Sequence, residues 1–216
     1  MASLPTTITL DVQPDQLRKI ALGSLAQAFG KAKPSIEAKV AQLVENAIVS
    51  SPEAADLQGG RLQGELGVLR PSDAIRAIIA TLQQSMQVSF ADHMLTVSLV
   101  KSDLQDVLRL GEATFRSEPS GQNVPWLEWL LTAGDQIVVL THHYLPFGGK
   151  TPGDIRLRSR TGLGLMAPYG KFGIGAWQVP PEFAGVPGDH WLTRALAVVL
   201  PQIADVALQE MVRAAP

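Results

Sequence analysis

Residues 71–100 read PSDAIRAIIATLQQSMQVSFADHMLTVSLV, and the change of periodicity inside this stretch decides the fold. In the first half, apolar residues recur at helical spacing behind a proline, a serine and an aspartate, which suit a first helical turn. From Met86 to Val100 the period is two, with a turn at 91–93, and this alternation predicts a β-hairpin. A helix followed directly by a hairpin favours a fold that separates helices from antiparallel strands.

Before this stretch, the sequence predicts an extended arm followed by helices. Residues 1–13 favour extended structure, because three threonines and an isoleucine cluster there. One helix is expected from Pro14 to Gly30 and a second from Pro34, since glycine ends helices and proline suits their first turn. The expected apolar stripe of the second helix is Ile36, Val40, Leu43, Val44, Ala47 and Ile48. Residues 51–70 carry three glycines within six positions and predict a loop that leads into a short extended piece.

Beyond the hairpin, short elements lead to a closing helix. The elements expected in order are a short helix at 102–110, a strand within GEATFRSE (111–118), an apolar helix at 125–134, a strand at 135–144, a glycine- and proline-rich loop at about 146–158, a strand at 160–166 and a helix at 190–213. Asp189 is the expected N-cap of the last helix, and Pro201 should kink or split that helix. The prediction is a single α+β domain over 14–216, with N-terminal helices, a central mostly antiparallel sheet and a kinked C-terminal helix.

Composition narrows the class of protein. The chain has 216 residues, of which 46% are hydrophobic and 18% charged, and its formal net charge is −2. This composition allows a sizeable core and leaves few charges for the surface, as is common where a partner covers part of a protein. The charge excludes a strongly basic coat for nucleic acid. Cysteine is absent, which excludes disulfides and thiolate chemistry. No signal peptide and no membrane-spanning run is predicted.

Tests for catalytic and ligand-binding motifs give no site. The glycine-rich stretch at 58–67 lacks the Gly-Lys-Ser/Thr ending of a phosphate-binding loop. His142 and His143 would point to opposite faces of a strand, so they do not suit one metal ion. Asp189 and His190 suggest an acid–base pair, but no serine in a nucleophile-elbow context accompanies them. We therefore expect no catalytic residues, no cofactor and no metal, and we keep a hydrolase that uses Asp189 and His190 as the alternative.

One basic cluster is more ordered than scattered surface charge. It consists of Lys150, Arg156, Arg158 and Arg160, and the three arginines alternate so that an extended chain would present them on one face. Three roles fit this pattern: pairing with the carboxylates of a neighbouring subunit, contact with DNA phosphates, or a solvated strand face. We take the four residues as the candidate subunit interface.

Two of the four tryptophans are spaced for one helix face. Trp126 and Trp129 lie three residues apart, which favours packing of the short helix against the sheet. An interface anchor is the alternative role for this pair.

Three segments resemble virion structural proteins of tailed bacteriophages. They are SPEAADLQGGRLQGELGV (51–68), VPWLEWLLTAGDQIVVLTHHY (124–144), and SRTGLGLM (159–166) followed by GAWQVPPEFAGVPGDHWLTRAL (175–196). Their order and wording are similar to the neck or tail-completion class, and the resemblance covers roughly half of the chain. Helices, then a small-residue loop, then a sheet also resemble the wider tail-completion fold.

The resemblance implies a structural role and no enzymatic one. It implies a ring-forming neck or head–tail connector subunit that joins the portal to the tail, with a tail terminator or a minor tail protein as alternatives. The partners expected are identical subunits, portal or adaptor proteins and tail proteins, with transient contact to DNA passing through the channel and no membrane. The expected location is the neck or tail of a virion that is assembled in the host cytoplasm.

Overall fold

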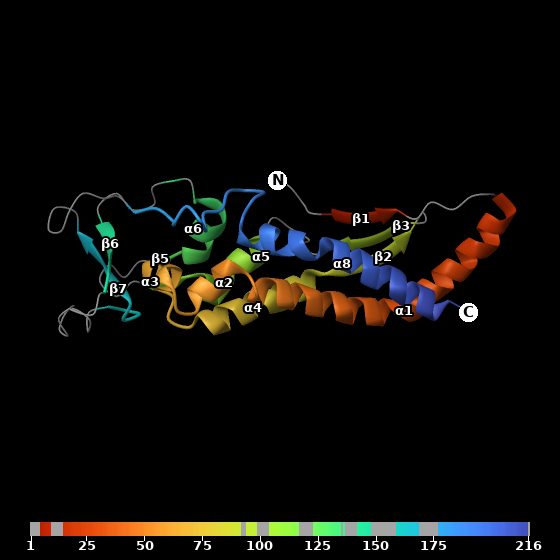
Figure 1. The fold of residues 1–216 in the computed structure, drawn as a ribbon, viewed down its shortest axis with the longest axis horizontal. Helices are drawn as coiled ribbons and strands as arrows, with labels where there is room; N and C mark the ends of the chain where they lie inside the picture. Colours follow the sequence, from red (N-terminus) through yellow and green to blue (C-terminus); the bar gives the residue numbers. More distant parts are fainter. Residues whose placement is uncertain are drawn as a thin grey trace.

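The chain folds as an elongated α+β domain in which three long helices run side by side along the body (Figure 1). The computed structural model describes residues 5–9, 15–91, 94–98, 104–116, 123–134, 136, 142–147, 159–168 and 177–215. The described elements in chain order are β1 (Pro5–Thr9), α1 (Asp15–Val49), α2 (Pro52–Leu57), α3 (Arg61–Leu66), α4 (Pro71–Ser85), β2 (Gln87–Ala91), β3 (Met94–Ser98), α5 (Gln105–Leu108), the 3₁₀ helix η1 (Gly111–Ala113), β4 (Phe115–Arg116), β5 (Asn123–Val124), α6 (Trp126–Thr132), β6 (His142–Pro146), β7 (Gly164–Pro168) and α8 (Trp191–Ala214). The predicted fold class is therefore confirmed.

Helix α1 is one continuous helix, whereas the sequence predicted two helices separated at Gly30 and Pro34. It continues because tertiary packing outweighs the local cost of proline: Ala28 and Ala32 are buried on the same side as the predicted stripe. Gly30 and Pro34 are both exposed. The carbonyl that loses its helical hydrogen bond to Pro34 therefore lies on the solvent side, where water can replace the missing donor.

Two short helices replace the loop predicted for residues 51–70. Ser51 caps α2, its hydroxyl accepting a hydrogen bond from the Ala54 amide at 3.2 Å, and Pro52 occupies the first turn. Gly67 ends α3 in the left-handed conformation at φ 70°. Gly60 and Gly67 therefore cap the two ends of α3, Gly64 lies inside it, and Leu57, Leu62 and Leu66 enter the core.

The predicted hairpin is confirmed as β2 and β3, and the N-terminal arm adds a third strand to it. The sheet order is β1-β3-β2 and both pairings are antiparallel. Val88 of β2 and Leu95 and Val97 of β3 are buried, so one face of this sheet closes the helical core. Phe90 at the end of β2 stacks on Phe29 of α1, with ring centroids 5.6 Å apart.

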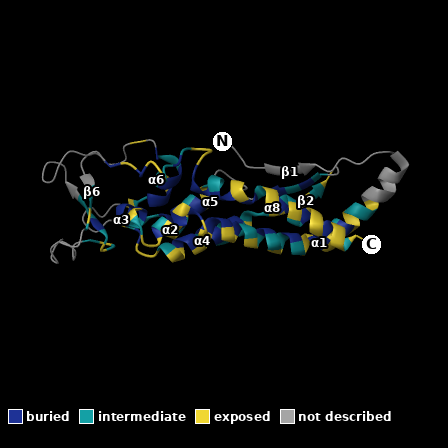
Figure 2. Cartoon of the chain, viewed as in Figure 1, coloured by how far each residue is buried: buried dark blue, intermediate teal, exposed yellow. Residues whose placement is uncertain are grey.

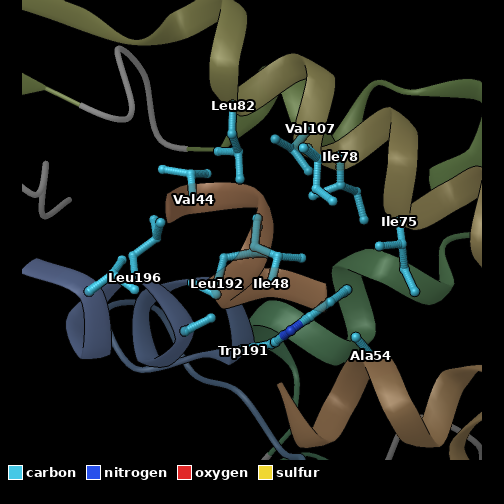
Figure 3. Close-up of a cluster of buried hydrophobic side chains, with 14 of the residues drawn as sticks. Val44, Ile48, Ala54, Ile75, Ile78, Leu82, Val107, Trp191, Leu192 and Leu196 are labelled. Atoms are coloured by element: carbon cyan, nitrogen blue, oxygen red, sulfur yellow. The ribbon is translucent and has the colours of Figure 1, made fainter. Parts of the chain in front are cut away.

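The core lies between α1, α4 and α8 (Figures 2 and 3). Every predicted stripe residue of α1 packs there, with Leu43 at the edge. α8 runs antiparallel to α1, because the Trp191 indole donates to the Ser51 hydroxyl at 2.7 Å at one end and Lys39 meets Glu210 at 2.7 Å at the other. α8 is not split at Pro201, which is exposed. Side chains drawn in Figure 3 include Val44, Ile48, Ala54, Ile75, Ile78, Leu82, Val107, Trp191, Leu192 and Leu196.

Glu210, near the end of α8, links α8 to α1 through its carboxylate. Its carboxylate accepts hydrogen bonds from the Lys39 ammonium at 2.7 Å, the Ser35 hydroxyl at 2.7 Å and the Arg213 guanidinium at 2.6 Å. The bonds from Lys39 and Ser35 lower the pKa of Glu210 to about 2. A carboxylate at this point therefore stays charged across the physiological pH range and joins α8 to α1.

The other end of the body carries small elements that depart from the predicted strands. GEATFRSE contributes the 3₁₀ helix η1 and a two-residue strand, β4, which pairs with β5. The strand expected at 160–166 begins at Gly164 and forms the two-stranded sheet β6–β7. Of the strand expected at 135–144, the part at 137–141 lies outside the described residues, as does the loop at 148–158.

All four tryptophans pack within the fold, although α6 does not rest on the sheet as predicted. α6 contacts η1 and α8 instead. Trp126 is 1% exposed and its indole donates to the Glu112 carbonyl at 2.7 Å. Trp129 is half-buried and packs on Trp177, with ring centroids 5.8 Å apart.

Candidate functional site

Of the four predicted interface residues, the structure describes Arg160, while Lys150, Arg156 and Arg158 lie outside the described residues. Arg160 is exposed, and its guanidinium lies 4.2 Å from the centre of the Phe115 ring. It also donates to the Arg116 carbonyl at 3.3 Å. The contact with the phenyl ring fixes the position of the guanidinium, while its exposed N–H groups stay in contact with solvent. Arg160 can therefore still donate hydrogen bonds to a partner.

Asp189 and His190 have separate structural tasks. The N-cap of α8 is His190 and not Asp189: the His190 Nδ1 accepts from the Thr193 amide at 3.4 Å, and the Thr193 hydroxyl accepts from the His190 amide at 2.8 Å. Sequence reasoning missed this cap because histidine is seldom counted among capping residues. The exposed Asp189 carboxylate pairs with Arg194 at 3.4 Å. Both side chains are thus engaged in contacts that shape the start of α8.

Arg194 connects the first turn of α8 to two neighbouring segments. Its guanidinium meets the buried Glu53 carboxylate of α2 at 2.8 Å. It also donates to the carbonyls of Phe183 and Ala184, both at 3.3 Å. Five donors in a planar fork suit this task better than a lysine ammonium would. The residue thereby holds the segment at 180–189 against the helical core.

Replacing Arg194 by methionine is expected to lower the free energy of unfolding by about 2 kcal/mol, because it leaves the Glu53 carboxylate buried without its partner. The measurement is urea denaturation followed by tryptophan fluorescence. The double variant Arg194→Met with Glu53→Gln should regain part of the loss, since a neutral amide tolerates burial better. Equal stability of the single and double variants would mean that the pair is not coupled.

A second buried carboxylate, Glu65, was not singled out in the sequence. One oxygen accepts from Arg61 within α3, and the other accepts from the Trp177 indole at 2.8 Å. Arg61 is also 3.6 Å from Glu182. Both oxygens of Glu65 are thus engaged by the protein itself, and the arrangement fixes α3 to the segment that begins at 177.

Tyr144 of β6 fits closely between two glycines. A Cβ atom at Gly64 would lie 2.1 Å from the Tyr144 hydroxyl oxygen, and one at Gly164 would lie 2.3 Å from its ring. Burial and then the charge of Glu65 raise the pKa of Tyr144. Glycine is therefore required at these two positions because a side chain would collide with Tyr144. The absence of side chains there lets the β6–β7 sheet pack on α3.

The described residues contain no group of three or more histidines or carboxylates that could hold a metal ion. His142 and His143 lie on neighbouring positions of β6, as expected from the sequence.

The outer face of α8 carries three of the five exposed large apolar side chains in the described part of the chain. Val198, Leu208 and Val212 are 72%, 48% and 67% exposed. With the exposed Pro201 and Asp205 they form one row at the spacing of positions a and d in a heptad, which we call the α8 row. Asp205 is the one charged member of the α8 row. Such a row suits contact with another protein surface.

The same helix is the one described helix whose length and composition would allow it to cross a membrane. Its opposite face is packed in the core, where Trp191, Leu196 and Ile203 are buried. It also carries Arg194 and Glu210 in ion pairs to α2 and α1. A core helix of a folded domain meets the same criterion of length and composition, so the feature alone does not indicate a membrane span.

Comparison with known proteins gives no relative: no family model, no curated protein and no solved structure matches the chain.

Proposed function

We propose that this protein is a structural subunit of a tailed-bacteriophage particle, a ring-forming neck or connector protein that joins the portal to the tail, and not an enzyme. The observation that carries an assembly role is the α8 row. Three large apolar side chains on one helix face are costly to leave in water, and contact with another subunit removes them from it. The resemblance of the segments at 51–68, 124–144, 159–166 and 175–196 supplies the class of particle.

The chemistry of the described residues supports the same proposal. The buried charged groups are engaged in fixing helices and loops, as for Glu53 with Arg194 and Glu210 with Lys39. Asp189 and His190, the pair that the hydrolase alternative requires, serve an ion pair and a helix cap. An elongated body (Figure 1) with exposed apolar side chains on one helix is suited to contacts between subunits.

The first test is the assembly state of the purified protein, measured by analytical ultracentrifugation and by negative-stain images. The native chain should form oligomers, and Val198→Glu with Val212→Glu should shift it to monomers because the new carboxylates resist burial. The matched control is Gln84→Glu, which adds a charge at an exposed position of α4 away from the α8 row. Monomers at every concentration of the native chain would contradict the assembly role.

The second test locates the protein in intact phage particles by mass spectrometry and by antibody labelling. A neck or connector subunit should be present in several copies between portal and tail. Labelling at the end of the tail tube next to the head would indicate a tail terminator, and labelling along or below the tube a minor tail protein. Absence from purified particles would refute the phage role.

The predicted interface residues give a further prediction. Changing Arg156, Arg158 and Arg160 together to glutamine should leave the subunit folded and weaken its assembly, because guanidinium groups suit a neighbour's carboxylates. Added salt should weaken native assembly in the same way, since ions screen exposed charges. Arg160→Gln alone should cost about 0.5–1 kcal/mol of stability through the lost contact with Phe115. Unchanged assembly of the triple variant, measured by sedimentation, would remove these arginines from the interface.

A further inference from the structure

The N-terminal strand is attached to the rest of the fold through one neighbour. β1 forms five residue pairs with β3, from Pro5 opposite Ser98 to Thr9 opposite Met94. Among the described elements, β3 is the one with which β1 shares an extensive contact (Figure 1). The interaction is therefore a backbone ladder along one edge, and such a ladder depends on register and not on which chain supplies the strand.

Without β1, strand β3 would be an open sheet edge. Residues 94–98, MLTVS, carry no charge and no proline, which are the usual devices that keep an edge strand from pairing with another chain. β1 itself begins at Pro5. Proline is tolerated on an edge strand, because it has no backbone N–H to donate to a neighbouring strand. The sequence of β3 is thus typical of an inner strand, which pairs with a neighbouring strand on both of its edges.

The described core is built from α1 and the elements that follow it. Val88, Leu95 and Val97 reach the core from β2 and β3, and the other described core residues come from the helices and from non-helical positions such as Val68, Trp177 and Val179. The chain between Thr9 and Asp15 is five residues long, so it spans at most about 20 Å when fully extended. A short connection of this kind favours exchange of a terminal element once two copies lie next to each other.

We propose that the edge of β3 is a strand-acceptor site, and that in the assembled protein its occupant is residues 5–9 of a second copy of this chain. The exchanged strand makes the same five pairs with Met94–Ser98 that it makes within one chain. Exchange joins two subunits through the hydrogen bonds of this ladder and needs no new complementary surface, because the pairing already exists within one chain. The inference rests on the proposed function only in requiring that copies of the chain assemble.

The test uses the absence of cysteine from the chain, which makes every introduced thiol unique. One sample carries Thr7→Cys and a second, tagged sample carries Thr96→Cys, because these two residues are opposite each other in the ladder. Directly opposite residues of an antiparallel pair come close enough for a disulfide. The two samples are mixed, unfolded, refolded together and oxidised, and the products are separated on a non-reducing gel.

Strand exchange predicts a covalent heterodimer, since neither chain alone holds both thiols. The matched control replaces Thr96→Cys by Ser89→Cys, which lies in the same row on β2, two strands from Thr7 and roughly 10 Å away. We expect several-fold more heterodimer from the first pair than from the control. Equal, background yields from both pairs would overturn the proposal, as would an exclusively intrachain disulfide in the double variant Thr7→Cys with Thr96→Cys.

Removal of residues 1–9 gives an independent readout. The truncated chain should keep the helical circular-dichroism signal of α1, α4 and α8 and should not form the oligomers that we expect of the native chain in sedimentation. Oligomers of undiminished mass would contradict strand exchange. The two proposals fail separately: heterodimers from a protein absent from phage particles would leave strand exchange standing, whereas a protein present in particles without heterodimers would leave only the phage role.

Discussion

Replacing Trp191 by alanine is expected to lower the free energy of unfolding by about 3–5 kcal/mol. The indole is fully buried at the start of α8, where that helix meets α1 and α2 (Figure 3). Its N–H donates to the Ser51 hydroxyl, which in turn donates to the Ile48 carbonyl and accepts from the Ala54 amide. The substitution therefore leaves a large cavity and also removes one bond from the turn that joins α1 to α2.

The measurement is urea denaturation of the purified variant followed by circular dichroism. Trp129→Ala is the matched control, because that indole is half-buried against Trp177 and should cost less than half as much. Trp191→Phe should fall between the native chain and the alanine variant, since it keeps most of the volume but not the donor. Equal losses from Trp191→Ala and Trp129→Ala would contradict the packing described for the core.

Acidification from pH 6.5 to pH 4 is expected to remove about 3 kcal/mol of stability through His190. Burial, reinforced by the neighbouring Arg194 cation and opposed by Asp189, lowers the pKa of His190 from 6.5 to about 4. Above pH 6.5 the imidazole is neutral in both the folded and the unfolded chain, and the stability is complete. Below pH 6.5 the unfolded chain takes up a proton that the folded chain does not, so stability falls until the pH reaches about 4.

The variant His190→Asn isolates this effect. Asparagine is a good N-cap and does not titrate, so α8 should keep its first turn while the pH dependence between 6.5 and 4 becomes flatter. Thermal unfolding measured at pH 7.5, 5.5 and 4 gives the comparison. Glu210, whose pKa is lowered to about 2, should cause a further loss below pH 4.5 in both proteins. A variant with the native slope from pH 6.5 to 4 would refute the assignment to His190.

The two ends of α8 thus respond to acid for opposite chemical reasons. At its start a neutral imidazole resists protonation because it is buried beside a cation, and near its end a carboxylate resists protonation because Lys39, Ser35 and Arg213 donate to it. Both groups attach α8 to its surroundings. Any assembly that uses the α8 row therefore depends on contacts that neutral pH preserves.

The sequence by itself determined the elements whose periodicity is strong. The helix at 71–85, the hairpin that follows it, the short apolar helix near 126–132 and the closing helix are all at the predicted places. The inward stripe of α1 was also readable, because Ile36, Val40, Val44 and Ile48 repeat every four residues. These features follow from local patterns of apolar residues, and a folded chain has to bury such residues.

Tertiary structure alone decided the rest, because long-range contacts outweigh local preferences. Gly30 and Pro34 signal a helix end, yet α1 continues through them, since its buried face gains more from packing than the exposed defect costs. Gly60 and Gly67 became the two caps of α3 because Leu62 and Leu66 between them reach the core. The pairing of β1 with β3 and the bonds that Arg194 and Glu210 make to α2 and α1 join residues up to 175 positions apart, which no local pattern records. The cap by His190 is local, but histidine is seldom counted among capping residues.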